Sequence, residues 1–288
     1  MRDHDGDIAA LQVGLHVRRP ARNGLRLYTT DFDSVSLSDF YRGRQAFLVL
    51  SGPSLADIDL SQLDRRGILT MGVNNSWSVY RPTLWTCVDS PGRFIDTGWK
   101  DPGILKFVPM SSWNGRLRIQ KPNGTMKPSA FRVKQMPSVL LYRRSEHFDH
   151  RKFLDEDVVC WGNNSATKDS LGIKGKRSVM LVALRLLHYL GFRTVYLVGA
   201  DFKMADDRKY AFEETRTNAA IRHNNVLYDS LNQRFEAMAD YFKKSRFNVL
   251  NCTPDSGLTA FPHLPFEDAI AKASAECGKP VNTKGWYT

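Results

Sequence analysis

The sequence has few of the features that mark membrane or secreted proteins. Its longest apolar runs, such as Ala46–Leu50 and Val195–Val198, are far shorter than the roughly 20 residues that cross a bilayer. The first residues, Arg2–Asp7, are mostly charged and contain no apolar segment of the kind found in signal peptides. We therefore expect a protein of the cytoplasm without a transmembrane segment.

The sequence also has little that would hold a metal. Its four cysteines show no CxxC spacing, so we expect free buried thiols in a reducing compartment rather than disulfides or a metal site; they are Cys87, Cys160, Cys252 and Cys277. No group of histidines and cysteines has metal-ligand spacing. Three short D-x-D triplets occur at 31–33, 57–59 and 155–157, but none follows a predicted strand. The sequence predicts no metal site.

What is present is the pattern of an α/β domain. Hydrophobic residues make up 42% of the 288 residues, which is typical of a globular chain. Continuous apolar runs are typical of strands buried on both faces. Helical spacing of apolar residues predicts helices over 179–190, with Gly191 as the stop, and over about 219–244. Strands are expected at 46–50, 67–73, 84–88, 105–108, 139–142, 158–161, 194–198 and 247–251.

This alternation of strands and helices predicts a doubly wound, mostly parallel sheet. We assign residues 43–260 to the nucleotide-binding domain. Residues 1–42 are interpreted as an N-terminal arm or peripheral region, and residues 261–288 as a tail that packs on the body. Segment 111–137 is rich in Gly, Pro, Lys and Arg and lacks a clear period, so we expect a long loop.

Positive charge is concentrated in a basic insertion at about 111–152. Ten Lys and Arg residues lie between Trp113 and Lys152 against only Glu146 and Asp149, a local excess of +8 in a chain of net charge +11. Such a field attracts a polyanion: nucleic acid, an anionic glycan or nucleotide phosphates. A solvated basic loop is the alternative. We select Arg116, Arg118, Arg143 and Arg144 as candidate acceptor-binding residues.

Ligands of doubly wound sheets bind outside the carboxyl ends of the strands, and the turn Ser51–Leu55 lies at one such end. Gly52 allows close approach of the backbone, Pro53 stiffens the turn, and Ser54 is placed to cap the next helix, whose first amides would face an anion. The GxGxxG fingerprint and a Walker lysine are both absent. An ordinary strand–helix turn is the alternative.

Polar residues follow the other predicted strands. Asn74 and Asn75 offer hydrogen-bond donors and acceptors to a base or ribose, or form a simple turn. Asp89 is a candidate for a ribose hydroxyl or a turn cap. Ser178 precedes the strong helix, and Gly199 and Asp201 follow the strand at 194–198.

Two residues further along the chain have side chains suited to catalysis. Tyr210 lies in a polar loop, where a phenol could stabilise a departing nucleotide without a metal; a rim tyrosine is the alternative. His223 lies at the start of the predicted helix 219–244 and is the candidate general base, or a helical histidine with no catalytic role.

Taken together, several motifs resemble those of a known superfamily. The run Leu48–Leu55, with its Gly-Pro-Ser-Leu turn, resembles the nucleotide-binding opening of the small single-domain bacterial sialyltransferases. Ser178–Phe202 resembles their central helix and strand, Tyr210–Phe212 follows at a similar interval, and Asn251–Ser256 resembles their closing strand. The archaeal hydroxymethylpterin diphosphokinase-like family shares the layout. The resemblance covers roughly residues 46–260.

The resemblance implies a modified Rossmann-like fold that binds a cytidine nucleotide-sugar without a metal. Gly52 and Ser54 would face the phosphates, and Asn74 would contact the nucleotide near the leaving group. The nucleoside pocket would be formed by Ser178, Gly199, Asp201, Thr253 and Ser256. Tyr210 would stabilise the leaving phosphate and His223 would be the base. Two positions depart from the family pattern: Ser51 replaces an asparagine, and Lys203 replaces a second phosphate-binding tyrosine.

Three functions are consistent with this sequence. The first is a metal-independent glycosyltransferase that moves a sugar from a nucleotide-sugar donor to a hydroxyl of an anionic acceptor, either a glycan or a hydroxylated base in DNA. The second is a pyrophosphoryl- or nucleotidyltransferase that needs Mg²⁺, with Asp89 and Asp201 as the ligand pair. The third is a non-catalytic module that binds nucleotides or nucleic acid.

Overall fold

The computed structural model describes residues 24–121, 125–145, 147–160, 168–174, 178–203 and 218–277, with backbone only at 160, 218–226 and 276–277. Its strands are β1 Leu27–Tyr28, β2 Ser34–Val35, β3 Gln45–Val49, β4 Leu69–Val73, β5 Leu84–Thr86, β6 Leu105–Pro109, β7 Arg116–Gln120, β8 Met126–Arg132, β9 Val139–Tyr142, β10 Arg144–Ser145, β11 Val159–Cys160, β12 Thr194–Val198 and β13 Asn248–Asn251. Its α-helices are α2 Asp96–Lys100, α3 Val179–Tyr189, α4 Asn218–Lys244 and α5 Phe266–Cys277.

Nine of these strands form one sheet in the order β13-β12-β3-β4-β5-β6-β9-β1-β2. Every neighbouring pair from β13 to β9 is parallel, whereas β1 and β2 join the far edge antiparallel. The predicted α/β fold, a Rossmann-like doubly wound and mostly parallel sheet, is confirmed. Part of the expected N-terminal arm, residues 27–35, belongs to this sheet.

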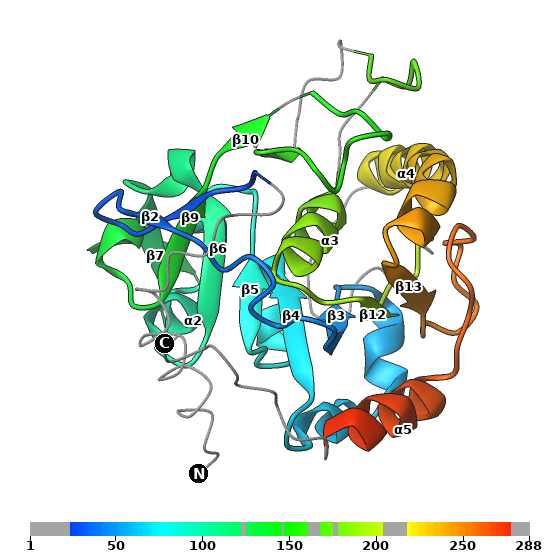
Figure 1. The fold of residues 1–288 in the computed structure, drawn as a ribbon. Coiled ribbons are helices and arrows are strands. Elements are labelled where there is room, and N and C mark those ends of the chain that lie inside the picture. Colours follow the sequence, from blue (N-terminus) through cyan, green and yellow to red (C-terminus); the bar gives the residue numbers. More distant parts are fainter. Residues whose placement is uncertain are drawn as a thin grey trace, which may run out of the picture.

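Helices cover both faces of the sheet because the central strands are apolar on both sides. Along β3, Ala46 and Leu48 belong to the core beneath α3 and α4, whereas Phe47 and Val49 pack with α5 on the opposite face. Figure 1 shows α3 and α4 on one side of the strands and α5 on the other. A continuous apolar run thus fills two cores.

Helix α3 begins and ends where the sequence predicts. The Ser178 hydroxyl accepts a hydrogen bond from the Met180 amide at 3.1 Å and caps the first turn. Gly191, with φ of +98°, ends the helix; a Cβ atom there would lie 2.8 Å from the Asp39 Cα atom. The helix is buried along its length, which makes it the centre of the main core.

Two expectations of local structure are wrong. The segment 111–137 contains the β7–β8 hairpin rather than only loop, because Leu117 is buried between the exposed Arg116 and Arg118 and so alternates like a half-buried strand. The turn at Ser51–Leu55 continues as a short 3₁₀ helix, Pro53–Asp57, rather than as an α-helix.

Within the residues that the structure describes, no helix combines the length and the apolar character needed to span a membrane.

Candidate functional site

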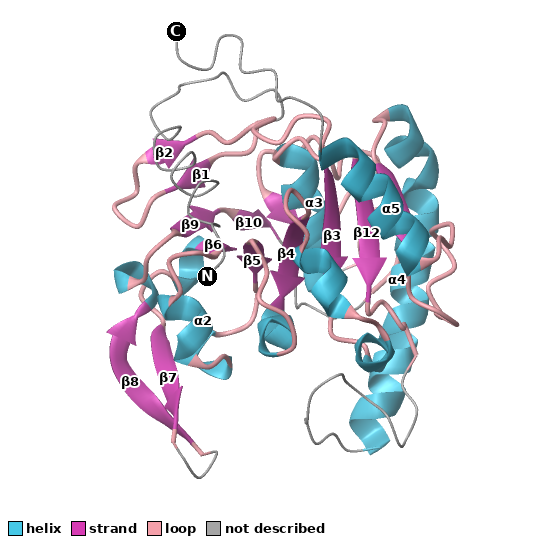
Figure 2. Cartoon of the chain, turned by 90° about the horizontal axis from the view of Figure 1, so that it is seen from below, coloured by secondary structure: helices cyan, strands magenta, loops and turns pink. Residues whose placement is uncertain are grey.

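The strand order changes direction between β3 and β12. From β3 the chain builds β4, β5, β6 and β9 on one side, and later returns to add β12 and β13 on the other. Loops that leave adjacent strands at such a switch point diverge to opposite faces, which leaves room for a ligand at the carboxyl edge. In Figure 2 the arrowheads of β3 and β12 lie side by side at this edge. The candidate site is therefore centred on these two strand ends.

The turns after β3 and β12 are joined through their glycines. The Gly52 amide donates to the Gly199 carbonyl at 2.9 Å. A Cβ atom at Gly52 would lie 1.8 Å from Asp201 Oδ2, and one at Gly199, whose φ is +74°, would lie 2.7 Å from Leu55 Cγ. Neither position can hold a side chain without displacing its neighbour. The two turns thus form one closely packed unit.

Asp201 is the residue that braces this unit. Its Oδ1 accepts from the Ser54 amide at 3.2 Å and its Oδ2 accepts from the Ser54 hydroxyl at 2.7 Å. The carboxyl group is buried, and burial raises its pKa although the Ser54 hydrogen bonds oppose the shift. The chain's own carboxylate therefore occupies the anion position at the start of the 3₁₀ helix.

This arrangement corrects the role expected of Ser54. The sequence predicted a Ser54 hydroxyl that caps a helix and faces phosphate, but both its hydroxyl and its amide are held by Asp201. Pro53 is buried and has no N–H to donate. Ser51, by contrast, is half-buried and takes part in no hydrogen bond between described residues. Ser51 is thus the turn residue available to a phosphate.

Thr253 and Ser256 support the β12 turn from the β13 side. The Thr253 hydroxyl accepts from the Ala200 amide at 2.8 Å, and the Ser256 hydroxyl donates to the Ala200 carbonyl. Thr253 is completely buried. The structure brings both residues to the predicted site, where their hydroxyls hold its backbone rather than stand free as a ligand wall.

Asn74 supplies an unused polar atom beside the turn. It directly follows β4, the neighbour of β3, and has a left-handed backbone with φ of +49°. Its Oδ1 atom is buried and has no hydrogen-bond partner among the described residues. A buried acceptor without a partner costs free energy unless a ligand or water satisfies it. Asn75 is half-buried next to it, and its carbonyl accepts from Ser78.

An aromatic cluster fixes the position of Asn74. The Trp85 indole N–H donates to the Asn74 carbonyl at 2.9 Å. Trp77 stacks on Trp85 with ring centroids 4.0 Å apart, and Trp99 meets both edge-on. A Cβ atom at Gly98 would lie 2.4 Å from Trp77 Cε3, so α2 packs flat against the stack. The strained Asn74 backbone thus rests on rigid support.

Ser178 and Asp89 stand further from the turn. Ser178 lies at the same edge of the sheet because α3 runs antiparallel to the strands, but its hydroxyl already caps α3. Asp89 forms an ion pair with Arg93 at 3.1 Å. The strands before Asp89 and Asp201, β5 and β12, are three positions apart in the sheet, roughly 14 Å. The strands that lead to the two carboxylates are therefore not neighbours, and the Asp201 carboxylate is held by Ser54, so this Mg²⁺ pair stays a prediction.

The candidate catalytic residues fall mostly outside the described side chains. Lys203 is exposed and lies close enough to Asp201 for its charge to lower the pKa of that carboxyl. Tyr210 lies outside the described residues. His223 lies in the described backbone of α4, near the helix end that meets the carboxyl edge, but its side chain is not among those described.

The four candidate arginines lie in two places. Arg116 and Arg118 are on β7, which contacts the segment Pro91–Arg93 after β5, and Arg143 and Arg144 follow the end of β9. All four are exposed.

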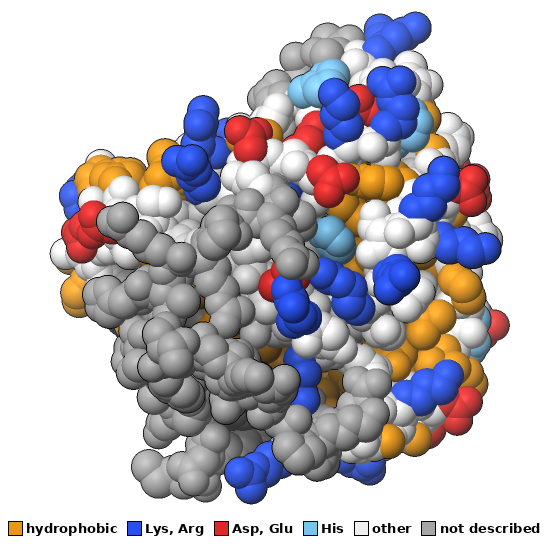
Figure 3. All heavy atoms as spheres, viewed as in Figure 1, with side chains coloured by type: hydrophobic (Ala, Val, Ile, Leu, Met, Phe, Trp, Pro, Cys, Tyr) orange, Lys and Arg blue, Asp and Glu red, His pale blue; other side chains and the backbone are white. Residues whose placement is uncertain are grey.

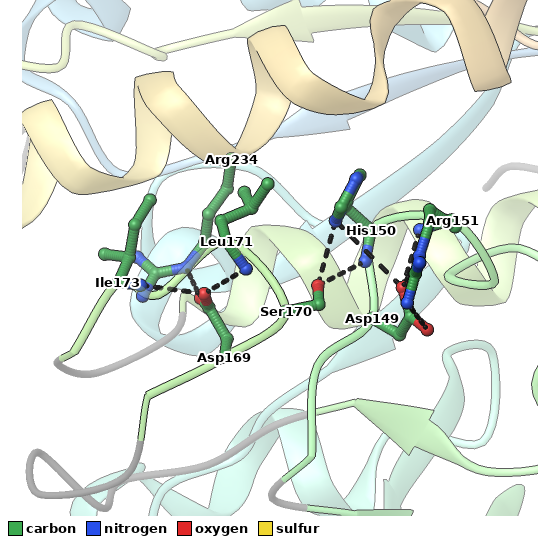
Figure 4. A network of polar contacts seen from close by, with 8 residues as sticks. All are labelled: Asp149, His150, Arg151, Asp169, Ser170, Leu171, Ile173 and Arg234. Carbon is green, nitrogen blue, oxygen red and sulfur yellow. Dashed lines mark hydrogen bonds and ion pairs between the residues drawn. The ribbon is translucent and has the colours of Figure 1, made fainter.

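A buried ion pair that the sequence did not predict joins loop 168–174 to α4. Arg234 Nε donates to Asp169 Oδ2 at 2.7 Å, and both side chains are fully buried. Asp169 Oδ1 accepts from the amides of Leu171 and Ile173 (Figure 4). The two charged residues are 65 positions apart, and no local pattern in the sequence marks them as partners.

Beside this pair lies a second polar network. His150 Nδ1 lies 2.9 Å from the Ser170 hydroxyl, and the Asp149 carboxylate accepts from the Arg151 guanidinium at 3.0 and 3.2 Å (Figure 4). The hydrogen bonds from Arg151 lower the pKa of Asp149 to about 2. The Asp149 carboxylate, the Ser170 hydroxyl and His150 Nδ1 all bond within the network, so we interpret it as structural.

Metal-binding residues do not gather in the part of the chain that the structure describes: no three His, Cys, Asp or Glu side chains are placed to share an ion. Cys87 and Cys252 are free and buried, as the sequence predicted, and burial raises the pKa of Cys252 to about 12. No family model, curated protein or solved structure significantly matches this chain.

Proposed function

We propose that this protein is a glycosyltransferase that moves a sugar from a nucleotide-sugar donor to a hydroxyl of an anionic acceptor. The observation that carries the proposal is the switch point between β3 and β12, where two closely packed glycine turns lie next to the strand end that bears Asn74, whose Oδ1 has no hydrogen-bond partner among the described residues. A strand edge that presents an acceptor without a partner among the described residues is suited to a ligand that bears hydroxyl or amino donors, as a nucleotide does.

In this proposal the turn holds the donor's phosphates through Ser51. The Ser54 amide and hydroxyl both donate hydrogen bonds to Asp201. The amide and hydroxyl of Ser51 form no hydrogen bond between described residues and can therefore donate to a phosphate. The Asp201 carboxylate is a positioning group, and its negative charge near a phosphate is offset by the exposed Lys203. Asn74 Oδ1 accepts a hydrogen bond from the sugar or the base.

The transfer step uses residues near α4. The acceptor hydroxyl gives its proton to the His223 imidazole as its oxygen bonds to the anomeric carbon of the sugar. The bond from that carbon to the donor's phosphate oxygen breaks, and its electron pair leaves on the nucleotide. Lys203 and Tyr210 stabilise the departing phosphate, so this mechanism requires no metal. Replacing Tyr210 by Phe or His223 by Ala should therefore lower turnover under saturating donor.

A thermal-shift screen of cytidine and uridine nucleotides and their sugar conjugates, with and without Mg²⁺, tests the donor site. A bound nucleotide raises the melting temperature with ligand concentration. We expect stabilisation without Mg²⁺ and sugar transfer or donor hydrolysis with the stabilising conjugate. Stabilisation that needs Mg²⁺ would instead support a pyrophosphoryl- or nucleotidyltransferase, and binding without any turnover a non-catalytic module.

The Asn74→Gly variant tests the position of the site. Glycine fits the left-handed backbone and removes only the side chain, so nucleotide affinity should fall about five- to tenfold, the effect of one lost hydrogen bond. Arg246→Gly is the matched control, because Arg246 also has a positive φ, of +52°, but follows α4 at the opposite edge of the sheet. Equal nucleotide affinity of the two variants, measured by calorimetry, would place the nucleotide elsewhere.

A further inference from the structure

The β7–β8 hairpin carries a concentration of positive charge that no acidic side chain in the described part of the chain pairs with. Residues 102–145 contain no Asp or Glu, and six Lys and Arg lie between positions 116 and 134: Arg116, Arg118, Lys121, Lys127, Arg132 and Lys134. None of these six takes part in an ion pair between described residues. On the face that carries α3 and α4, by contrast, Lys and Arg side chains are dispersed among neutral ones (Figure 3).

Three of the arginines share the solvent-facing side of the hairpin. Arg116 pairs directly with Arg132 across the strands, and Arg118 pairs with Pro128. Directly opposed residues point to the same face, and Leu117, which points to the other face, is fully buried in the body. Like charges in direct opposition destabilise a hairpin. A bound anion would relieve this repulsion.

Two of these guanidinium groups are held in place by backbone carbonyls. Arg118 Nη2 donates to the Met126 carbonyl at 3.2 Å, and Arg132 Nη1 donates to the Asn114 carbonyl at 2.7 Å. A guanidinium has five N–H donors, so several remain for a phosphate. Anchoring reduces the entropy that these side chains lose when they bind a ligand.

The hairpin also presents an aromatic ring. Phe131 is 44% exposed, and Lys100 Nζ lies 5.2 Å from the centre of its ring. Large hydrophobic side chains this exposed are rare in the described chain; Phe32 is the other. An exposed ring on the same strand as Arg132 can stack on a nucleobase, which is flat and aromatic, whereas the ring of a sulfated or carboxylated sugar is not aromatic.

The hairpin begins close to the proposed active site. A Cβ atom at Gly92 would lie 3.4 Å from the Arg118 side chain, and Gly92 follows Asp89 at the carboxyl end of β5. That strand lies two positions from β3, roughly 10 Å. Figure 2 shows the hairpin extending past the carboxyl edge of the sheet. A strand bound along it has one end near the β3 turn.

We propose that the β7–β8 hairpin is a docking arm for single-stranded nucleic acid. Arg116, Arg118 and Arg132 bind its phosphates and Phe131 stacks on a base. If the proposed glycosyl transfer is correct, this identifies the acceptor as a nucleic acid; the docking itself does not depend on that activity.

Fluorescence anisotropy with a labelled single-stranded oligothymidylate, in the absence of any nucleotide donor, tests this proposal. We expect binding that weakens steeply with salt, because each neutralised phosphate releases a counterion. The triple variant Arg116→Gln/Arg118→Gln/Arg132→Gln should bind at least about tenfold more weakly and lower the salt slope by about two. Phe131→Leu should weaken binding about tenfold through lost stacking.

The control is Arg65→Gln/Arg66→Gln, which removes two exposed arginines ahead of β4, at the opposite edge of the sheet. It should bind the oligonucleotide almost as tightly as the parent. Equal affinity of the parent and the triple variant would overturn the proposal. So would a sulfated glycan that binds as tightly as the oligonucleotide with no effect of Phe131→Leu.

Two measurements keep this proposal separate from the donor site. Circular dichroism checks that the variants fold, as expected for replacements at solvent-facing positions. Nucleotide binding by the triple variant should equal that of the parent, because the hairpin arginines do not touch the β3 turn. Loss of oligonucleotide binding with intact nucleotide binding supports the arm, whereas intact binding of both ligands would contradict the arm without affecting the donor site.

Discussion

At the scale of single residues, the candidate site depends on the Asp201 carboxylate, which occupies the space that a side chain at Gly52 would fill. Asp201 fills the space next to Gly52 and holds both polar groups of Ser54. The glycine is therefore required by close approach of a neighbour rather than by its own backbone angles, since its φ is not positive. In the proposed function, the phosphate-binding role therefore belongs to Ser51, which forms no hydrogen bond between described residues.

Gly52→Ala should destabilise the protein and weaken nucleotide binding together. The new methyl group would meet Asp201 Oδ2 at 1.8 Å, so the carboxylate must leave Ser54. We expect the free energy of unfolding to fall by about 1–3 kcal/mol, typical of overpacking at a buried position. Urea denaturation measures this change. Gly92→Ala is the control, since a methyl group there meets its nearest neighbours at 3.4 Å. If Gly52→Ala were as stable as Gly92→Ala, the packing argument would fail.

At the scale of elements, the best-defined long-range link is the one between α4 and loop 168–174. The Asp169–Arg234 pair is fully buried, and Arg234 also donates to the Ser230 carbonyl at 3.1 Å and to the Lys174 carbonyl at 3.4 Å. Helix α4 begins at the carboxyl edge of the sheet, and His223 lies near that end of the helix. The Asp169–Arg234 pair therefore also fixes the position of the helix that bears the proposed base.

Arg234→Met should lower the free energy of unfolding by about 3–5 kcal/mol, because it leaves the Asp169 carboxylate buried without its counter-charge. Arg42→Met is the matched control: Arg42 is 63% exposed and lies 3.6 Å from Asp39. Exposed pairs of this kind contribute at most about 1 kcal/mol. Guanidinium denaturation compares the two variants, and a similar small loss in both would show that the buried pair does not anchor α4.

At the scale of the whole molecule, stability should depend on pH through a buried histidine. His188 in α3 is 6% exposed, and its ring meets Phe247 edge-on at 5.2 Å. Burial, with the nearby positive charges of Arg193 and Arg185, lowers its pKa to about 4. Between pH 4 and about 6.5 the unfolded chain therefore binds more protons than the folded one, and falling pH favours unfolding.

Lowering the pH from 7 to 4 should therefore destabilise the protein by about 2–3 kcal/mol through His188 alone. The His188→Phe variant keeps a ring against Phe247 but binds no proton. Denaturation at both pH values should show a smaller loss of stability in this variant than in the parent, by that amount. Identical pH dependence of the two proteins would show that His188 is not the group responsible.

The fold could be predicted from the sequence because its signals are local. The apolar run Ala46–Leu50 and the helical spacing that ends at Gly191 predict buried elements without reference to distant residues. The β7–β8 hairpin was missed because Pro128 and many charged residues hide the alternation around Leu117. The N-terminal strands are only two residues long, too short to show a period, so the sequence predicted no more than an arm or peripheral region there.

Sequence alone determined that glycine-containing turns follow β3 and β12 and that residues 102–145 carry charge of one sign. Only the tertiary structure decided what those turns do. Asp201 lies 147 positions from Ser54, yet it accepts hydrogen bonds from both the amide and the hydroxyl of Ser54. The physical reason is that strand order sets which turns become neighbours. Hydrogen bonds form between groups that are close in space. The pattern of apolar and polar residues along the chain does not specify the order of the strands in the sheet.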